Sequence, residues 1–203
     1  MSCSTDTMPA IGALALARVP FLSASGRLRL ALSLGDRLLE TLGCAEAETV
    51  LGRKLDRERW MPGVWQKAAI DDAEYLQRAG AYAVTYFDRR YPALLRETHR
   101  PPFLLYVRGT LPPADRPALA IVGTRYPTGR GLEAARTLAA EAGMAGIPVV
   151  SGLARGIDSA AHRGAIAGGG ATWAVLGRCI AEGHPPSNRG LPQAMLGRGG
   201  GLG

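Results

Sequence analysis

Apolar residues recur at two different spacings along the chain, and the change of spacing divides the chain into three regions. From about residue 8 to residue 79 they recur every three or four positions, as in Ile11–Val19 and Arg27–Gly43. This spacing places them on one face of a helix, so the pattern predicts a small helical domain over residues 1–80. The segment around Phe21–Ala24 has the outline of a helix-hairpin-helix, but its turn lacks the glycines that let backbone amides approach a phosphate. We therefore expect a structural role for this region.

Residues 81–117 predict a connector with short strands. The runs 81–87 and 103–107 are rich in aromatic and β-branched residues and read as strands. A helical turn is expected after Pro92, because proline suits the first turn of a helix. A proline-rich loop then leads into the third region.

Residues 118–203 alternate apolar runs with helical patterns. Buried strands are expected at 118–122, 147–150 and 172–177, and helices at 132–146 and 158–169. In the first of these helices, one face carries Leu132, Ala135, Leu138, Ala139 and Ala142. Strand–helix–strand order with short turns predicts a parallel sheet with right-handed crossovers. The fold class expected is α/β, a Rossmann-like parallel sheet preceded by a small helical domain.

The loops after the first two strands of this sheet carry the candidate chemistry. Ligands of such sheets bind beyond the carboxyl ends of the strands, where helix N-termini favour anions. Gly123 and Gly152 would let the backbone approach a ligand, and Arg125 and Arg155 add positive charge at the same edge. Together these four residues predict a phosphate-binding cradle, although the glycines also suit tight turns.

Asp158 and His162 follow on the next helix, four residues apart and on one face. Asp158 stands where a helix N-cap belongs, so we expect it to cap that helix. An Asp158–His162 pair could orient a base, but no nucleophile is obvious and Ser151 is the only nearby candidate, so catalysis by Ser151 and His162 is disfavoured. Binding explains the pattern more simply than turnover does.

Known cofactor motifs are missing from the chain. Arg125 stands where the dinucleotide fingerprint needs its second glycine, and no Walker sequence is present. The three cysteines, Cys3, Cys44 and Cys179, are far apart and form no metal-ligand pattern. We therefore expect neither a cofactor nor a bound metal.

Charge is concentrated in the second half of the chain. The whole chain has 24 basic and 17 acidic residues, a net charge of +7, and its basic residues are mostly arginine. From Tyr91 onward, the chain has 12 basic and 6 acidic residues. This balance favours a polyanionic partner, although charge alone also fits a solvated arginine surface. No apolar run could span a membrane, and the N-terminus is a poor secretory signal, so a cytoplasmic protein is expected.

Three segments resemble the DNA-processing protein A (DprA, or Smf) family. They are "LAIVGTRYPTGRG", "VVSGLARGIDSAAHRGAIAGGGATWAVLG" and "YPALLRETHRPPFLLYVRG". The resemblance implies a protein without catalytic activity that binds single-stranded DNA during natural transformation and loads the RecA recombinase onto it. It also implies phosphate contacts at these positions: Gly123, Arg125, Ser151, Gly152 and Arg155.

The chain ends earlier than the family pattern, at "MLGRGGGLG". We therefore expect a member truncated at its C-terminus, for which the homodimer of the family is doubtful. The alternative function is a nucleotide-processing Rossmann enzyme of the phosphoribohydrolase type, whose glycine-rich motif with a catalytic glutamate is not present here. A nucleotide sensor that uses the same cradle is a third possibility.

Overall fold

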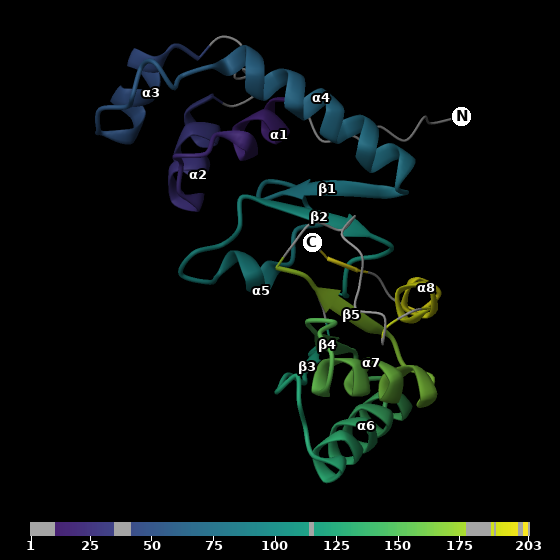
Figure 1. Cartoon of the computed structure of the whole chain (residues 1–203). Coiled ribbons are helices and arrows are strands. Elements are labelled where there is room, and N and C mark those ends of the chain that lie inside the picture. Colours follow the sequence, from purple (N-terminus) through teal and green to yellow (C-terminus); the bar gives the residue numbers. More distant parts are fainter. Residues whose placement is uncertain are drawn as a thin grey trace. The chain divides into compact units, whose positions relative to one another are not determined.

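The computed structural model describes residues 11–34, 42–113, 116–177, 188, 190–198 and 201–202. The chain forms two compact units, Met1–Leu105 and Tyr106–Gly203 (Figure 1). The boundary falls inside the region predicted as a connector, so residues 81–117 are divided between the two units.

Helices dominate the first unit, as the spacing of its apolar residues predicts. In chain order they are α1 (Ile11–Arg18), α2 (Ala24–Leu34), α3 (Cys44–Leu51), α4 (Pro62–Arg78) and α5 (Ala93–Arg96), with strand β1 (Ala81–Thr85) between α4 and α5. The core contains Leu14 and Leu16 of α1 and Trp65, Ala69 and Leu76 of α4, all buried. Helix α5 follows Pro92, which holds its N-cap position as expected. Within the described residues, no helix combines the length and the apolar character that a membrane span requires.

The turn between α1 and α2 is packed into the first unit. The ring of Phe21 lies 6.2 Å from that of Trp60 and 5.8 Å from that of Trp65, centroid to centroid. The hydroxyl of Ser23 accepts a hydrogen bond from the amide of Gly26 at 3.1 Å, which satisfies a free donor at the start of α2. These contacts pack the turn against the rest of the first unit, and its structural role stays a prediction.

A mixed sheet forms the centre of the second unit. The strands of this sheet are β2 (Leu104–Arg108), which begins at the boundary between the units, β3 (Leu119–Ala120), β4 (Val149–Ser151), β5 (Thr172–Val175) and β6 (Gly201–Leu202). The helices of the second unit are α6 (Gly129–Met144), α7 (Ile157–Ala167) and α8 (Leu191–Leu196). The strand order is β2-β6-β5-β4-β3. Strands β3 to β6 run parallel, whereas β6 pairs with β2 antiparallel. The α/β prediction is therefore confirmed.

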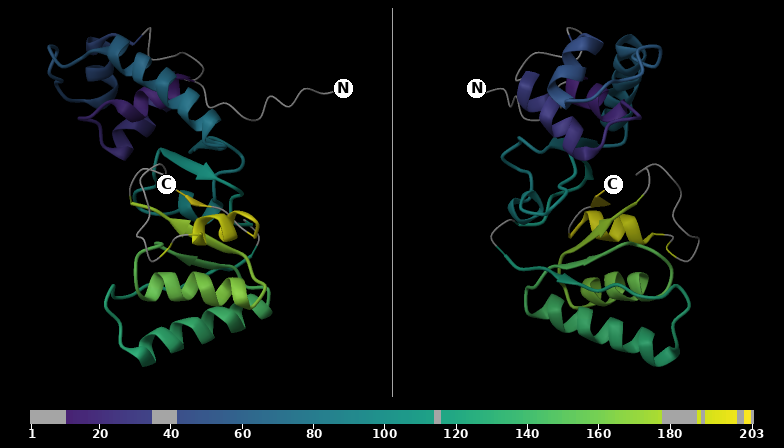
Figure 2. Two further views of the ribbon diagram at one scale, coloured as in Figure 1. Left: turned by 45° about the vertical axis from the view of Figure 1, so that its right-hand side comes forward. Right: turned by 90° about the vertical axis from the view of Figure 1, so that its left-hand side faces the viewer.

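Helices α6 and α7 lie on the same face of strands β3 to β5 (Figure 2). Neighbouring parallel strands joined in sequence by right-handed crossovers place both helices on one side. The two helices approach each other closely. A Cβ atom on Gly164 would lie 2.2 Å from the carbonyl oxygen of Arg136, and one on Gly168 would lie 2.2 Å from that of Ala140. Only small residues fit between them.

The apolar face predicted for α6 is only partly buried, because α6 lies so close to α7. Its alanines are buried, namely Ala135, Ala139 and Ala142. Leu132 and Leu138, expected on the same face, are exposed, Leu138 by 55%. The small residues occupy the interface because α7 leaves no space there for a leucine side chain.

Strand β3 also differs from expectation. The run 118–122 predicts a five-residue buried strand, whereas β3 has two residues, both exposed. It pairs on one side only, with β4. An edge strand is buried only where another element covers it, and the apolar composition of a run does not reveal its neighbours.

Candidate functional site

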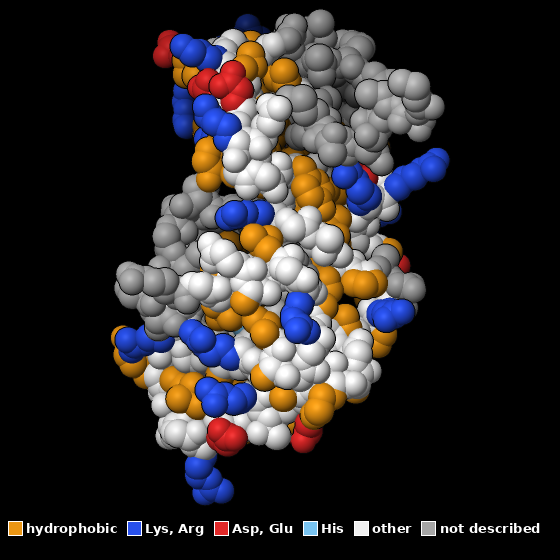
Figure 3. Space-filling view, turned by 90° about the vertical axis from the view of Figure 1, so that its right-hand side faces the viewer, with side chains coloured by type: hydrophobic (Ala, Val, Ile, Leu, Met, Phe, Trp, Pro, Cys, Tyr) orange, Lys and Arg blue, Asp and Glu red, His pale blue; other side chains and the backbone are white. Residues whose placement is uncertain are grey.

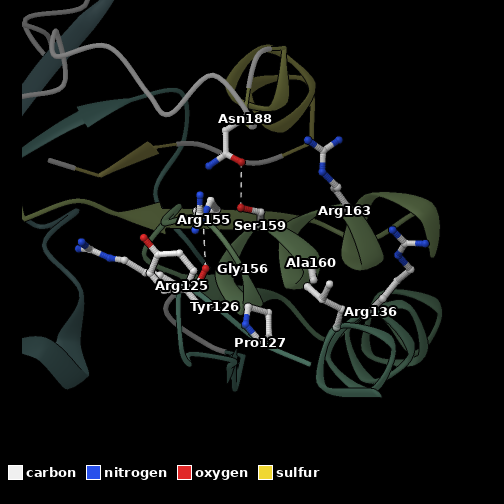
Figure 4. Close-up of a pocket in the computed structure, with 11 residues that line it drawn as sticks. Arg125, Tyr126, Pro127, Arg136, Arg155, Gly156, Ser159, Ala160, Arg163 and Asn188 are labelled. Atoms are coloured by element: carbon white, nitrogen blue, oxygen red, sulfur yellow. Dashed lines mark hydrogen bonds between the residues drawn. The ribbon is translucent and has the colours of Figure 1, made fainter. Parts of the chain in front are cut away.

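A cavity of about 480 Å³ opens where the loops after β3 and β4 meet the N-terminal end of α7. Among the described residues that line it are four arginines and no carboxylate. Arg125 and Arg155 come from the two loops, Arg136 comes from α6 and Arg163 from α7. Figure 4 shows the loop arginines at one end of the pocket and the helix arginines at the other. We call this cavity the arginine pocket.

The two loops that form one end of the pocket are in direct contact. Gly156 has φ +93°, and a Cβ atom there would lie 2.4 Å from the carbonyl oxygen of Thr124. The amide of Ile157 donates to the same carbonyl at 3.3 Å. A Cβ atom on Gly123 would lie 2.7 Å from the side chain of Ile157. Glycine is therefore needed at positions 123 and 156 so that the loops can touch.

Asp158 joins the two loops and does not cap the helix. Helix α7 begins at Ile157 with Gly156 at the N-cap, so Asp158 lies inside the first turn, and this corrects the expected cap. Its side chain is buried, and its two oxygens accept long hydrogen bonds of 3.4 Å from the amides of Gly123 and Ala154, one on each loop. The carboxylate thus connects both loops at the start of α7.

The structure brings only two of the five predicted phosphate-binding residues to the pocket wall, Arg125 and Arg155. Ser151 is 2% exposed, and its hydroxyl donates to the carbonyl of Ile121 at 2.6 Å. A Cβ atom on Gly152 would lie 2.8 Å from an oxygen of Asp158, so this glycine makes space for the carboxylate. Ser151 and both glycines thus shape the loops, and their contact with a ligand stays a prediction.

The two loop residues Arg155 and Tyr126 are stacked. The guanidinium carbon of Arg155 lies 4.1 Å from the centroid of the Tyr126 ring, well inside the range of a cation–π contact. Arg155 Nε also donates to the carbonyl of Arg125 at 3.3 Å. One guanidinium therefore connects both loops at the mouth of the pocket.

Sequence reasoning missed the other end of the pocket. Arg163 follows Ser159 by one helical turn on α7, and Arg136 lies on the neighbouring helix. The hydroxyl of Ser159 hydrogen-bonds to Asn188 Oδ1 at 2.8 Å, and Asn188 Nδ2 donates to the carbonyl of Leu153 at 2.8 Å. Arg163 could have been found from the sequence, because it lies four residues after Ser159 on the helix that follows the loop. The position of Arg136 at the pocket depends on how α6 and α7 pack.

His162 is fully buried and takes no part in the pocket wall. Its Nδ1 atom lies 2.7 Å from the hydroxyl oxygen of Thr172, and that hydroxyl donates to the carbonyl of Val149 at 2.9 Å. The Thr172 oxygen therefore accepts the proton of Nδ1. Nε2 has no hydrogen-bond partner among the described atoms. Burial lowers the pKa of His162 to about 4, against a smaller opposing effect of the Asp158 carboxylate.

This lowered pKa predicts a pH-dependent stability. The unfolded chain binds a proton at His162 below about pH 6.5, whereas the folded chain binds it only near pH 4. The free energy of unfolding should therefore fall as the pH drops from 6.5 towards 4. Urea unfolding at a series of pH values would show this loss in the wild type and its absence in His162→Leu. The exposed His99 provides the control, since His99→Leu should keep the wild-type profile. Parallel profiles for wild type and His162→Leu would contradict the assignment.

Residues that could bind a metal do not gather in the part of the chain that the structure describes. No group of three His, Cys, Asp or Glu side chains forms there. Cys44 is a free thiol, and Cys3 and Cys179 lie outside the described residues.

Known proteins resemble this chain both in sequence and in structure. The family described as DNA recombination-mediator protein A matches residues 82–202. Protein Smf of Synechocystis sp. is 38% identical over 127 residues, which cover 61% of this chain and 32% of that protein. DNA processing protein DprA of Streptococcus pneumoniae is 34% identical over 124 residues, which cover 60% of this chain and 43% of that protein. The chain thus spans less than half the length of these curated relatives.

Two solved structures share the fold. The X-ray structure of DprA from Streptococcus pneumoniae has a TM-score of 0.70 and 26% identity, and the match covers 97% of this chain and 67% of that one. A structure of DprA from Helicobacter pylori, described for its single-stranded DNA binding mode, has a TM-score of 0.51 and 26% identity. That match covers 60% of this chain and 54% of the other.

Proposed function

Because the chain belongs to the DNA recombination-mediator protein A family, we propose that its second unit binds single-stranded DNA by the sugar-phosphate chain in the arginine pocket. One observation carries the proposal: four arginines from two loops and two helices line a single cavity, with no carboxylate among the described lining residues. The DprA protein of Helicobacter pylori, whose structure is described for its single-stranded DNA binding mode, supports the same class of ligand.

The chemistry of the pocket suits a phosphodiester chain. Guanidinium groups bind phosphate oxygens through two parallel hydrogen bonds and keep their charge at any physiological pH. Arg125 and Arg155 lie next to the N-terminal end of α7, where backbone amides and the helix dipole add to the positive potential. Figure 3 shows arginine side chains spread over one face of the second unit, in the lower half of the view. Such a surface attracts nucleic acid without selecting a base sequence.

We extend the proposal to binding without cleavage, as a step in natural transformation in which the bound strand is passed to the RecA recombinase. The hydrogen-bond pattern supports binding over turnover. The hydroxyl of Ser151 donates to Ile121, and Nδ1 of His162 is engaged with Thr172, so the two side chains are committed to other partners.

Equilibrium binding across a salt series tests the proposal. Fluorescence anisotropy with a labelled oligo-dT should show binding whose log K falls linearly with log salt concentration. Since each phosphate contact on a single strand contributes a slope of about 0.7, a pocket that engages three or four phosphates should give roughly 2 to 3. A nucleoside monophosphate should compete poorly, because it offers one phosphate.

Two outcomes would contradict the proposal. The first is the absence of oligonucleotide binding at low salt by the folded chain. The second is tight binding of a nucleoside monophosphate with release of its free base, which would assign the pocket to an enzyme of the phosphoribohydrolase type.

A further inference from the structure

Tyr126 is the most exposed large apolar side chain near the arginine pocket, and its position is well defined. The residue is 79% exposed, yet it lies on the pocket wall. Its amide donates to the hydroxyl of Thr124 at 3.1 Å, and Pro127 restricts its backbone further. The ring is therefore available to a ligand that enters the pocket.

The ring has one covered face and one open face. The guanidinium of Arg155 covers one face at 4.1 Å, and Arg155 is itself held by its bond to the carbonyl of Arg125. Since the residue as a whole is 79% exposed, the opposite face remains accessible to solvent. The ring is therefore positioned before any ligand arrives, which reduces the entropy lost when a planar group stacks on it.

From this geometry we propose that Tyr126 is a stacking platform for one nucleobase of the bound strand. The inference rests on the proposed function, because it places the base beside a phosphate held by Arg125 and Arg155. Every base has a π face, so the platform accepts any base and selects no sequence. It does select single strands over duplex DNA, since the bases of a duplex already stack on their neighbours and leave no face for the tyrosine.

Two probes of equal charge separate stacking from phosphate contact. One is an oligo-dT, and the other is an oligomer of the same length with abasic residues throughout. Replacing Tyr126→Ala should weaken binding of oligo-dT about fivefold, the low end for loss of one stacked base. Affinity for the abasic oligomer and the salt dependence should stay at wild-type values. Tyr126→Phe keeps the ring and should retain wild-type affinity for both probes.

The possible results identify which statement fails. Equal affinity of wild type and Tyr126→Ala for oligo-dT would overturn the platform. An equal loss for both probes would also overturn it, because the ring would then act only by supporting Arg155. If the folded wild type binds neither probe, the proposed function fails and the platform with it. If the wild type binds both and only the platform result is negative, phosphate binding in the pocket stands.

Discussion

Replacing Arg125 and Arg155 together by alanine should weaken binding of single-stranded DNA about 100-fold at low ionic strength. Hydrogen bonds to a charged group contribute about 1.5–3 kcal/mol each, and 1.4 kcal/mol corresponds to about tenfold in affinity. The two side chains line the same end of the pocket from separate loops, so they can contact neighbouring phosphates. Loss of two contacts should also lower the salt slope by about 1.4.

A matched double variant controls for net charge. Arg116 precedes β3 and Arg198 lies beside Gly169, after the C-terminal end of α7. Both therefore lie on the side of the sheet where the parallel strands begin, whereas the pocket lies at the carboxyl ends of these strands. Arg116→Ala with Arg198→Ala removes the same charge and should change affinity by no more than about twofold, the scale of a screened distant charge.

The comparison of the two double variants decides where DNA binds. If both lose affinity equally, binding follows the overall charge of the unit and not the pocket. If Arg125→Ala with Arg155→Ala keeps the wild-type salt slope, the two guanidinium groups do not contact phosphate. Circular dichroism should confirm that each variant is folded.

The order of elements in the second unit could be predicted from sequence, because long helices and their intervening strands have clear periodicities. Which residues of α6 face α7 could not be predicted from the sequence. By hydrophobicity Leu138 belongs in the core, but the interface with α7 admits only residues without a long side chain, and this depends on the distance between two helices. Strand β6 has two residues, Gly201 and Leu202, which is too short for any periodic pattern.

The candidate site shows the same division. Arg125 and Arg155 could be placed from sequence because each follows a predicted parallel strand, and the ends of such strands meet at one edge. Arg136 could not, because its arrival at the pocket depends on the packing of α6 against α7. The packing of the loop glycines against Ile157 and Asp158 could not be predicted either, because only the tertiary structure brings these residues close.

Replacing Asp158→Asn should weaken binding of single-stranded DNA about tenfold, even though it removes a negative charge near an anion site. The two carboxylate oxygens accept one amide from each loop, at Gly123 and Ala154. An asparagine side chain offers one acceptor oxygen and turns its NH₂ group towards the other amide, so two donors face each other. An unsatisfied buried donor costs about 1–3 kcal/mol, and the loops that position Arg125 and Arg155 would move apart.

Electrostatics alone gives the opposite sign, which makes this variant informative. Removing a like charge should favour a bound phosphate, by about 1 kcal/mol at 4 Å in water. Glu133→Gln is the control, because Glu133 is exposed on α6 and its replacement makes the same change in charge. This control should bind oligo-dT as tightly as the wild type or slightly more tightly. A gain in affinity for Asp158→Asn would show that the carboxylate acts on DNA only through its charge. A loss in Asp158→Asn with no loss in Glu133→Gln would mean that the loops need the carboxylate to present their arginines, and that this need explains a buried negative charge beside an anion-binding pocket.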